Sequence, residues 1–151
     1  MFERFTQKAV STISSAHQNA IWLGSAQIQP EHLLLGLLHE STLGDASWTL
    51  LVPFKDWLSN QICARAPMKT QSSFSVETPF SREAKRVLES AIEEAKRLSD
   101  KQVGAEHVLL GLLRERDFFA AELLNGCGIL LETTRTAIAS LPRELKRKAA
   151  A

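Results

Sequence analysis

The sequence contains little of what several classes of protein depend on. Only two of its 151 residues are cysteines, Cys63 and Cys127, too few for a fold held together by disulfides. Both lie beside apolar residues, so we expect small core side chains in a reducing compartment. No apolar run approaches the roughly 20 residues of a membrane-spanning helix, and the N-terminus lacks the pattern of a signal peptide. These absences predict a cytoplasmic protein with no membrane partner.

An excess of charge of one sign and catalytic motifs are missing as well. The 18 Lys and Arg residues nearly balance the 17 Asp and Glu residues, whereas a general nucleic-acid binder usually carries a clear basic excess. The sequence has neither a phosphate-binding loop (Gly-x-x-x-x-Gly-Lys-Ser/Thr) nor the Gly-x-Ser-x-Gly motif of a hydrolase. We therefore predict that this chain is not an enzyme and has no nucleic-acid partner.

Four histidines, His17, His32, His39 and His107, are the candidates for a metal site. His32 and His39 lie about two helical turns apart and would share a helix face. No Cys or Asp stands at a short ligand spacing beside them, which disfavours zinc. We predict no metal and no cofactor, and we expect His32 and His107 to hydrogen-bond to the backbone near a helix start.

What the chain does have is an internal repeat. The segment Glu31–Glu40 returns as Glu106–Glu115, an offset of 75 residues that holds without a gap over 36 positions. The same offset joins Phe5 with Phe80, Thr6 with Ser81, Ala9 with Ala84, Ile13 with Leu88, Ala16 with Ala91, Ala20 with Ala95, Leu23 with Leu98 and Gln27 with Gln102. Such self-similarity at a fixed offset is the signature of one structural unit written twice.

The repeat divides the chain into four parts. The first repeat covers residues 1–64 and the second covers residues 80–142. Residues 65–79 are rich in Ser, Thr and Pro without a sustained period, which is typical of a linker. Residues 143–151 form a tail that is polar and basic.

Each repeat is predicted to begin with an amphipathic helix. Apolar residues recur at steps of three and four over residues 5–23 and again over residues 80–98. Thr6 and Ser81 are the expected N-caps. The second of these helices carries many charges on its outer face, which we interpret as a solvated, salt-bridged surface with pairs such as Glu93 and Arg97.

The next helix of each repeat is predicted to be buried, because residues 30–39 and 105–115 are apolar on nearly all sides. Pro30 suits the first helical position, where its missing N–H costs nothing. Gly36 lowers helix propensity by roughly 1 kcal/mol relative to alanine. Its return as Gly111 indicates that both copies need close helix packing at that point.

The remaining helices are expected at residues 43–51, 53–64, 117–124 and 130–140, with Gly126 and Gly128 ending the last helices. No segment shows the alternation of a strand. We therefore predict an all-α fold of two pseudo-symmetric four-helix repeats, packed into one compact domain like a pseudo-dimer.

The repeated Glu-His-Leu/Val-Leu-Leu-Gly-Leu-Leu, preceded by Phe-Thr/Ser and an alanine-rich helix, resembles the N-terminal domain of Clp-type AAA+ unfoldases. The opening Met1–Thr6 is most similar to the ClpC-type branch, which works with the Clp protease in many bacteria and in plastids. The resemblance covers essentially the whole chain. It implies a domain on top of a hexameric ATPase ring that receives protein substrates, directly or through adaptor proteins, and does no chemistry itself.

The resemblance also implies a site for phosphorylated arginine on substrates. Glu31 and Glu106 would meet the guanidinium group, whose planar shape suits a carboxylate. Thr6 and Ser81, at the starts of the first helices, would meet the phosphate together with backbone N–H groups.

This chain departs from the family pattern next to the two glutamates. The family usually has Gly-Thr before Glu-His, and here those positions are Gln29-Pro30 and Gly104-Ala105, so two hydroxyl groups are absent. From the residues alone, compensation of the helix dipole explains a glutamate at a helix start as well as ligand binding does.

Phe2 and Phe80 are the candidates for docking of adaptors or peptides. In the family that the chain resembles, docking takes place at the junction of the two copies, and exposed aromatic side chains tend to mark partner sites. Ordinary core packing of the two rings is the alternative.

Three functions remain open from the sequence. The first is a docking domain of a Clp unfoldase–protease system, with the Clp ATPase ring and Clp protease as partners and the isolated domain a monomer. The second is a free-standing accessory protein that regulates this machine. The third is a small helical protein that senses a metal or another ligand.

Overall fold

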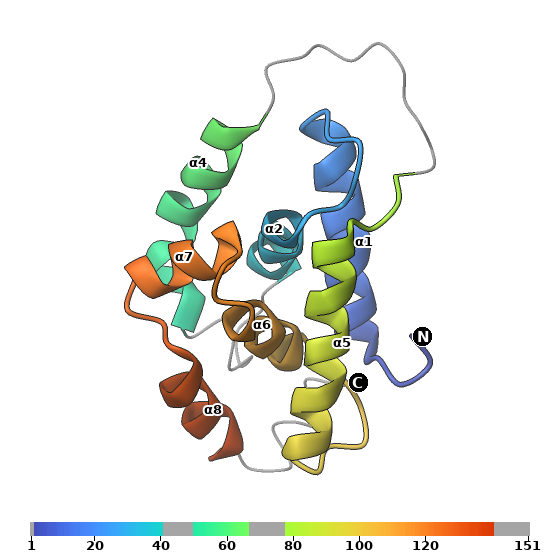
Figure 1. The fold of residues 1–151 in the computed structure, drawn as a ribbon, viewed down its shortest axis with the longest axis vertical. Coiled ribbons are helices and arrows are strands. Elements are labelled where there is room, and N and C mark those ends of the chain that lie inside the picture. Colours follow the sequence, from blue (N-terminus) through green and yellow to red (C-terminus); the bar gives the residue numbers. More distant parts are fainter. Residues whose placement is uncertain (1, 41–49, 67–77, 141–151) are drawn as a thin grey trace.

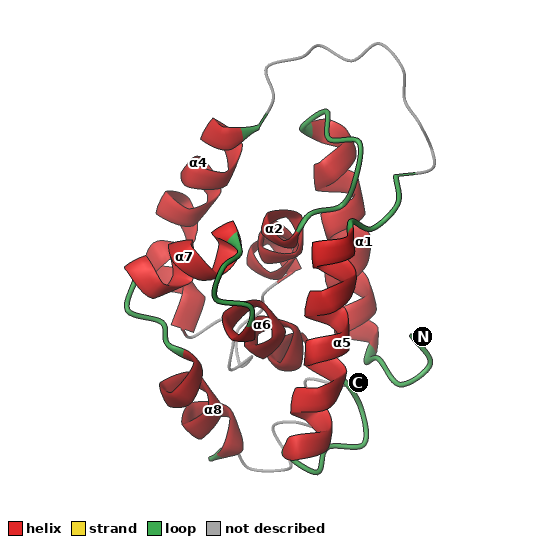
Figure 2. Cartoon of the chain, in the orientation of Figure 1, coloured by secondary structure: helices red, strands yellow, loops and turns green. Residues whose placement is uncertain are grey.

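The computed structural model describes residues 2–40, 50–66 and 78–140, and these contain seven α-helices, one short 3-10 helix and no strand (Figure 2). The helices of the first half are α1 (Gln7–Trp22), α2 (Pro30–Glu40), η1 (Val52–Phe54) and α4 (Lys55–Arg65). Those of the second half are α5 (Arg82–Arg97), α6 (Ala105–Arg114), α7 (Phe119–Gly126) and α8 (Leu131–Ala139). The predicted all-α fold is confirmed.

The two halves repeat the same plan in space. Helix α5 begins and ends 75 residues after α1, and α6 and α8 keep that offset from α2 and α4 to within one residue. Most of the helix predicted at 43–51, most of the linker at 65–79 and all of the tail at 143–151 lie outside the described residues.

Helices α2 and α6 form the centre of the domain and contact each other (Figure 1). Helix α1 packs along α2 and α5 packs along α6, while α4, α7 and α8 cover the opposite side (Figure 1). The large apolar residues of the two central helices that are at most 2% exposed are Leu33, Leu34, Leu35, Leu37 and Leu38 of α2, and Val108, Leu109, Leu110, Leu112 and Leu113 of α6. The prediction that these helices are buried is confirmed.

Side chains at the first positions fix where α1 and α5 start. The Thr6 hydroxyl accepts a hydrogen bond from the Ala9 N–H at 3.1 Å, and the Ser81 hydroxyl accepts one from the Ala84 N–H at 3.0 Å. Each cap satisfies an N–H that has no partner within the first helical turn. Both predicted N-caps are confirmed.

Some predicted helix ends were wrong by a few residues. Helix α4 begins at Lys55, because Pro53 belongs to the preceding 3-10 turn. Helix α7 begins at Phe119 because the Phe118 N–H bonds to the Glu115 carbonyl at 3.1 Å in a turn. Gly126 is the last residue of α7 rather than its breaker. The left-handed backbone that follows the helix falls on Gly128, whose φ is +80°.

The expectation of two core cysteines was wrong for Cys63, which is exposed. Helix α4 buries Leu58 and Ile62, one turn apart, so the residue after Ile62 points to another face. Cys127 is partly buried and packs against the core, and this burial raises the pKa of its thiol.

Two glycines let the central helices approach their neighbours closely. A Cβ on Gly36 would overlap the Thr12 carbonyl oxygen and lie 3.2 Å from the Ala16 nitrogen of α1. A Cβ on Gly111 would overlap the Val87 carbonyl oxygen and lie 3.0 Å from the Ala91 nitrogen of α5. The predicted close packing is confirmed in both copies. A side chain at either glycine would require the backbone of the neighbouring helix to move.

We expect Gly111→Ala to destabilise the domain. Overpacking a core typically costs about 1–3 kcal/mol, while alanine gains about 1 kcal/mol in helix propensity. Because backbone would have to move here, we expect the upper part of the resulting range, a net loss of about 1–2 kcal/mol. Urea denaturation followed by circular dichroism measures it. Gly126→Ala is the matched control, because its Cβ would meet nothing closer than Trp57 at 4.0 Å and should stabilise α7. Equal effects of the two substitutions would contradict the packing role.

Candidate functional site

The two repeats are joined by reciprocal backbone hydrogen bonds. The Thr6 N–H donates to the Val103 carbonyl at 2.9 Å, and the Ser81 N–H donates to the Ile28 carbonyl at 2.9 Å. The Val103 and Ile28 N–H groups donate in return, at 2.8 Å each, to the Arg4 and Pro79 carbonyls. Each repeat thus pairs the segment before its first helix with the segment before the other repeat's second helix.

This crossing brings the predicted site residues together in pairs. Val103 lies two residues before α6 and Ile28 two residues before α2. Therefore Thr6 lies at the α6 start, where Glu106 is, and Ser81 lies at the α2 start, where Glu31 is. The N-termini of α1 and α6 therefore lie together, as do those of α5 and α2, and helix N-termini are suited to anions.

The two hydroxyl groups are buried. Thr6 is 6% exposed and Ser81 is fully buried. Each accepts one N–H from its own helix, and a hydroxyl keeps one O–H donor besides. In this structure both hydroxyl groups therefore act as N-caps. Each still has an O–H that can donate a hydrogen bond to another acceptor.

The Glu31 carboxylate is in an environment that disfavours its charge. Burial raises the pKa of Glu31 above its ordinary value. The carboxylate's hydrogen bond to its own backbone N–H and the charge of Arg65 lower the pKa, and the charge of Glu83 raises it further. Arg65, at the end of α4, also stacks over the ring of Phe119 at 4.1 Å.

The Glu106 carboxylate lies close to the backbone of Gly104. A Cβ on Gly104 would overlap Glu106 Oε1 and lie 2.6 Å from Oε2. The side chain is 14% exposed, and Oε1 is 3.6 Å from His107 Nδ1. Gly104, which keeps the glycine of the family pattern, therefore leaves room for this carboxylate. The departure lies at the matching position of the first repeat, which is Gln29.

Two histidines hydrogen-bond to the backbone at the N-termini of the central helices. His32 Nδ1 accepts the Gln29 N–H and His107 Nδ1 accepts the Gly104 N–H, both at 2.8 Å. The predicted bonds to backbone are confirmed. His107 Nε2 lies 2.8 Å from Asp100 Oδ2, so it carries the proton and donates it. In the described ranges, no group of three or more His, Cys, Asp and Glu residues could hold a metal ion.

The two candidate docking residues meet at the junction. The Phe2 ring packs edge-on against Phe5 with centroids 5.2 Å apart, and it lies 6.0 Å from the Phe80 ring. Phe2 is 36% exposed while Phe5 is buried. The structure thus forms an aromatic cluster that spans both repeats and presents Phe2 to solvent.

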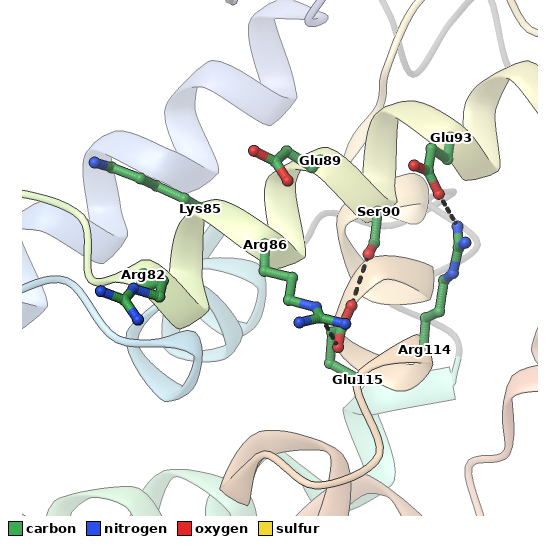
Figure 3. A pocket seen from close by; sticks show the side chains of 8 residues that line it. All are labelled: Arg82, Lys85, Arg86, Glu89, Ser90, Glu93, Arg114 and Glu115. Carbon is green, nitrogen blue, oxygen red and sulfur yellow. Dashed lines mark hydrogen bonds and ion pairs between the residues drawn. The ribbon is translucent and has the colours of Figure 1, made fainter.

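A polar cleft that the sequence did not reveal lies along α5 and the end of α6 (Figure 3). Its volume is about 640 Å³, and its lining residues are Arg82, Lys85, Arg86, Glu89, Ser90, Glu93, Arg114 and Glu115. Glu93 pairs with Arg114 at 2.6 Å, across to α6, and not with Arg97 as predicted. The charge-rich outer face of α5 was the available signal, but it could not show which residues α6 would add.

The fold and the junction define a class of protein: a helical domain built from one unit twice, with doubled carboxylates and helix N-termini where the units cross. The model of the family described as "Clp repeat (R) N-terminal domain" matches residues 4–127 and 79–149. The chain belongs to this family. None of the helices in the described residues is long and apolar enough to cross a membrane.

Named relatives are subunits of Clp systems. The chain is 39% identical over 142 residues to the "ATP-dependent Clp protease ATP-binding subunit ClpA homolog" of Guillardia theta, which covers 93% of this chain and 17% of that protein. It is 40% identical over 139 residues to "Chaperone protein ClpC1, chloroplastic" of Arabidopsis thaliana, covering 91% and 15%. The chain thus spans less than a fifth of the length of these relatives.

Solved structures show the same fold. The N-terminal domain of the caseinolytic protease associated chaperone ClpD from Arabidopsis thaliana has a TM-score of 0.67 and 28% identity, covering 91% of this chain and 93% of that one. The ClpV N-domain in complex with a VipB peptide has a TM-score of 0.74 and 16% identity, covering 99% and 92%. The second likeness is one of fold alone.

We expect stability to fall as the pH is lowered through the range in which His32 should titrate. Burial lowers the pKa of His32 from its ordinary 6.5 to about 4. Between pH 6.5 and about pH 4, the unfolded chain therefore binds a proton at His32 while the folded chain does not. The contribution of neutral His32 to the free energy of unfolding is therefore complete above pH 6.5 and is lost as the pH falls toward 4. Urea denaturation at intervals between pH 7 and pH 4 measures it.

His32→Asn provides the test, because an amide oxygen can accept the Gln29 N–H without titrating. Its free energy of unfolding should depend less on pH than that of the unmodified chain. His39→Asn, at an exposed position of the same helix, should keep the original dependence. A pH dependence that is the same in all three proteins would show that His32 does not cause it.

Proposed function

We propose that this domain is a non-catalytic receptor for protein substrates and adaptor proteins of an ATP-dependent Clp unfoldase–protease system. The observation that carries the proposal is the crossing of the repeats, which gathers both Thr/Ser–Glu pairs and the aromatic cluster at one junction. Membership of the family supports the same role. The partners in this proposal are substrates, adaptors, the Clp ATPase ring and Clp protease.

For the ligand we propose phosphorylated arginine on substrate proteins. The partly buried carboxylates Glu31 and Glu106 would bind the guanidinium group, since charge-assisted pairs of this kind are strong and directional. The N-termini of α1 and α5, with the Thr6 and Ser81 hydroxyl protons, would bind the phosphate. The geometry supports two equivalent sites, each made of residues from both repeats.

We propose the Phe2 and Phe80 rings as part of the docking surface for adaptors or peptides. Phe2 is the most exposed member of the cluster, and aromatic anchors dominate many protein interfaces. A protein of this fold, the ClpV N-domain, has been solved with a VipB peptide, so the fold is able to hold a peptide. A cytoplasmic location and a monomeric isolated domain remain predictions, and the Arabidopsis relative is a protein named as chloroplastic.

The second candidate is a free-standing domain of this family that regulates the Clp machine. It uses the same surfaces, and the difference lies in the length of the natural protein. An open reading frame that continues into phosphate-binding loops would favour the receptor domain of an unfoldase.

Calorimetric titration of phosphoarginine into the purified chain tests the ligand. We expect saturable binding at two equivalent sites, with Glu31→Gln and Glu106→Gln each weakening one of the two at least tenfold, or about 1.4 kcal/mol, and leaving the other unchanged. The glutamine variants keep the shape of the side chain and remove its charge. Free arginine and inorganic phosphate should each bind far more weakly, because each fills only half of a site.

Glu122→Ala is the control variant, because it removes an exposed carboxylate from the start of another helix. It should bind phosphoarginine as the unmodified chain does. An absence of binding in a chain that circular dichroism shows to be folded would overturn the phosphoarginine proposal and leave adaptor docking as the role to be tested.

A further inference from the structure

The charge on the outer face of α5 changes from positive to negative along the helix. Arg82, Lys85 and Arg86 lie within its first turns, at spacings of three and four that place them on one side of the helix. Glu89 and Glu93 follow one and two turns later. All five line the cleft against the end of α6 (Figure 3). The cleft therefore has a cationic end and an acidic end.

Part of this charge is fixed by contacts within the cleft. Glu115 lies 3.1 Å from Arg86 Nε and accepts a hydrogen bond from the Ser90 hydroxyl at 2.9 Å. In the part of the chain that the structure describes, Arg82, Lys85 and Glu89 form no ion pair. Arg82 and Lys85, next to the paired Arg86, are therefore the cations that a partner protein could bind.

The fold does not require these charges. At the matching positions of the first repeat, 75 residues earlier, stand Gln7, Val10 and Ser11 in place of the three cations. Helix α1 nevertheless packs on α2 with the same close glycine approach that joins α5 to α6. The charged cleft is therefore a property of the second repeat and not of the helix packing.

We propose that this cleft docks an acidic segment of a partner protein, whose carboxylates pair with Arg82 and Lys85 while Arg86 is held in place by Glu115. Charge complementarity is the reason: the guanidinium and ammonium groups at the cationic end of the cleft suit carboxylates. Glu89 and Glu93 oppose a nucleic-acid strand, because its continuous phosphates would be repelled there. This inference rests on the proposed receptor function and adds a site that begins next to the junction, at Arg82, and runs along α5 away from it.

The test uses a synthetic acetylated dodecapeptide with four glutamates separated by serine and glycine, and a second peptide with lysine in place of every glutamate. Each is titrated into isotopically labelled chain and followed by amide NMR shifts. We expect the acidic peptide to shift the amides of residues 82–90 and of Arg114 and Glu115. We also expect a several-fold loss of affinity when the salt concentration rises from 50 to 300 mM, because exposed charges are screened.

Two double variants separate a site from general attraction. Arg82→Gln with Lys85→Gln should weaken the acidic peptide at least tenfold. Lys96→Gln with Arg97→Gln removes the same charge from exposed positions at the other end of α5 and should change affinity less than twofold. Equal losses in the two variants, shifts outside the cleft, no shifts at all, or equal binding of the lysine peptide or of a dT12 oligonucleotide would each overturn the proposal.

The junction variants keep this result distinct from the phosphoarginine experiment. Glu31→Gln and Glu106→Gln should bind the acidic peptide as the unmodified chain does, since neither residue lines the cleft. Loss of peptide binding in those variants would place the acidic segment at the junction and contradict a separate cleft site.

Discussion

Two helices that cannot face water determine how the rest of the chain is arranged. The apolar side chains of α2 and α6 are buried around nearly the whole circumference, so each helix needs cover on every side. The two helices cover one another, and α1 and α5 approach to backbone contact at Gly36 and Gly111. Buried polar groups need hydrogen-bond partners, and His32 and His107 provide them for the backbone N–H groups just before the two helices. The N-termini of both helices lie at the junction.

The two copies keep this skeleton but differ in charge. In the second repeat, Glu94 is 1% exposed and forms a bidentate pair with Arg135, with distances of 2.6 and 3.2 Å. The matching positions of the first repeat are Asn19 and Asn60. Burying a carboxylate is costly unless its partner is well placed, so the pair requires the geometry between α5 and α8 that the structure shows. The same asymmetry appears on the surface, where four cations of the second repeat line the cleft along α5, and three of them stand where the first repeat has Gln7, Val10 and Ser11.

Features that depend on local chemistry were predictable from the sequence. The caps at Thr6 and Ser81, the close approach at the two glycines and the histidine bonds follow from residue types at fixed positions in one helix. The crossing of Phe5 with Val103 and of Phe80 with Ile28 was not predictable, because it joins segments far apart in the sequence through their backbones. The predicted pairing of Glu93 with Arg97 and the predicted burial of Cys63 were wrong for the same reason. Tertiary packing gives Glu93 the partner Arg114 and leaves Cys63 on an exposed face.

The pKa of Glu31 helps to decide between two roles for a glutamate at a helix start: compensation of the helix dipole and binding of a ligand. Dipole compensation alone favours the charged form and would lower its pKa. Burial instead outweighs the favourable backbone bond and the charge of Arg65, and the pKa is raised. A guanidinium brought to this carboxylate would act in the same direction as Arg65 and lower its pKa. An incompletely compensated carboxylate beside a helix N-terminus is the arrangement that a ligand with both a cation and an anion would complete.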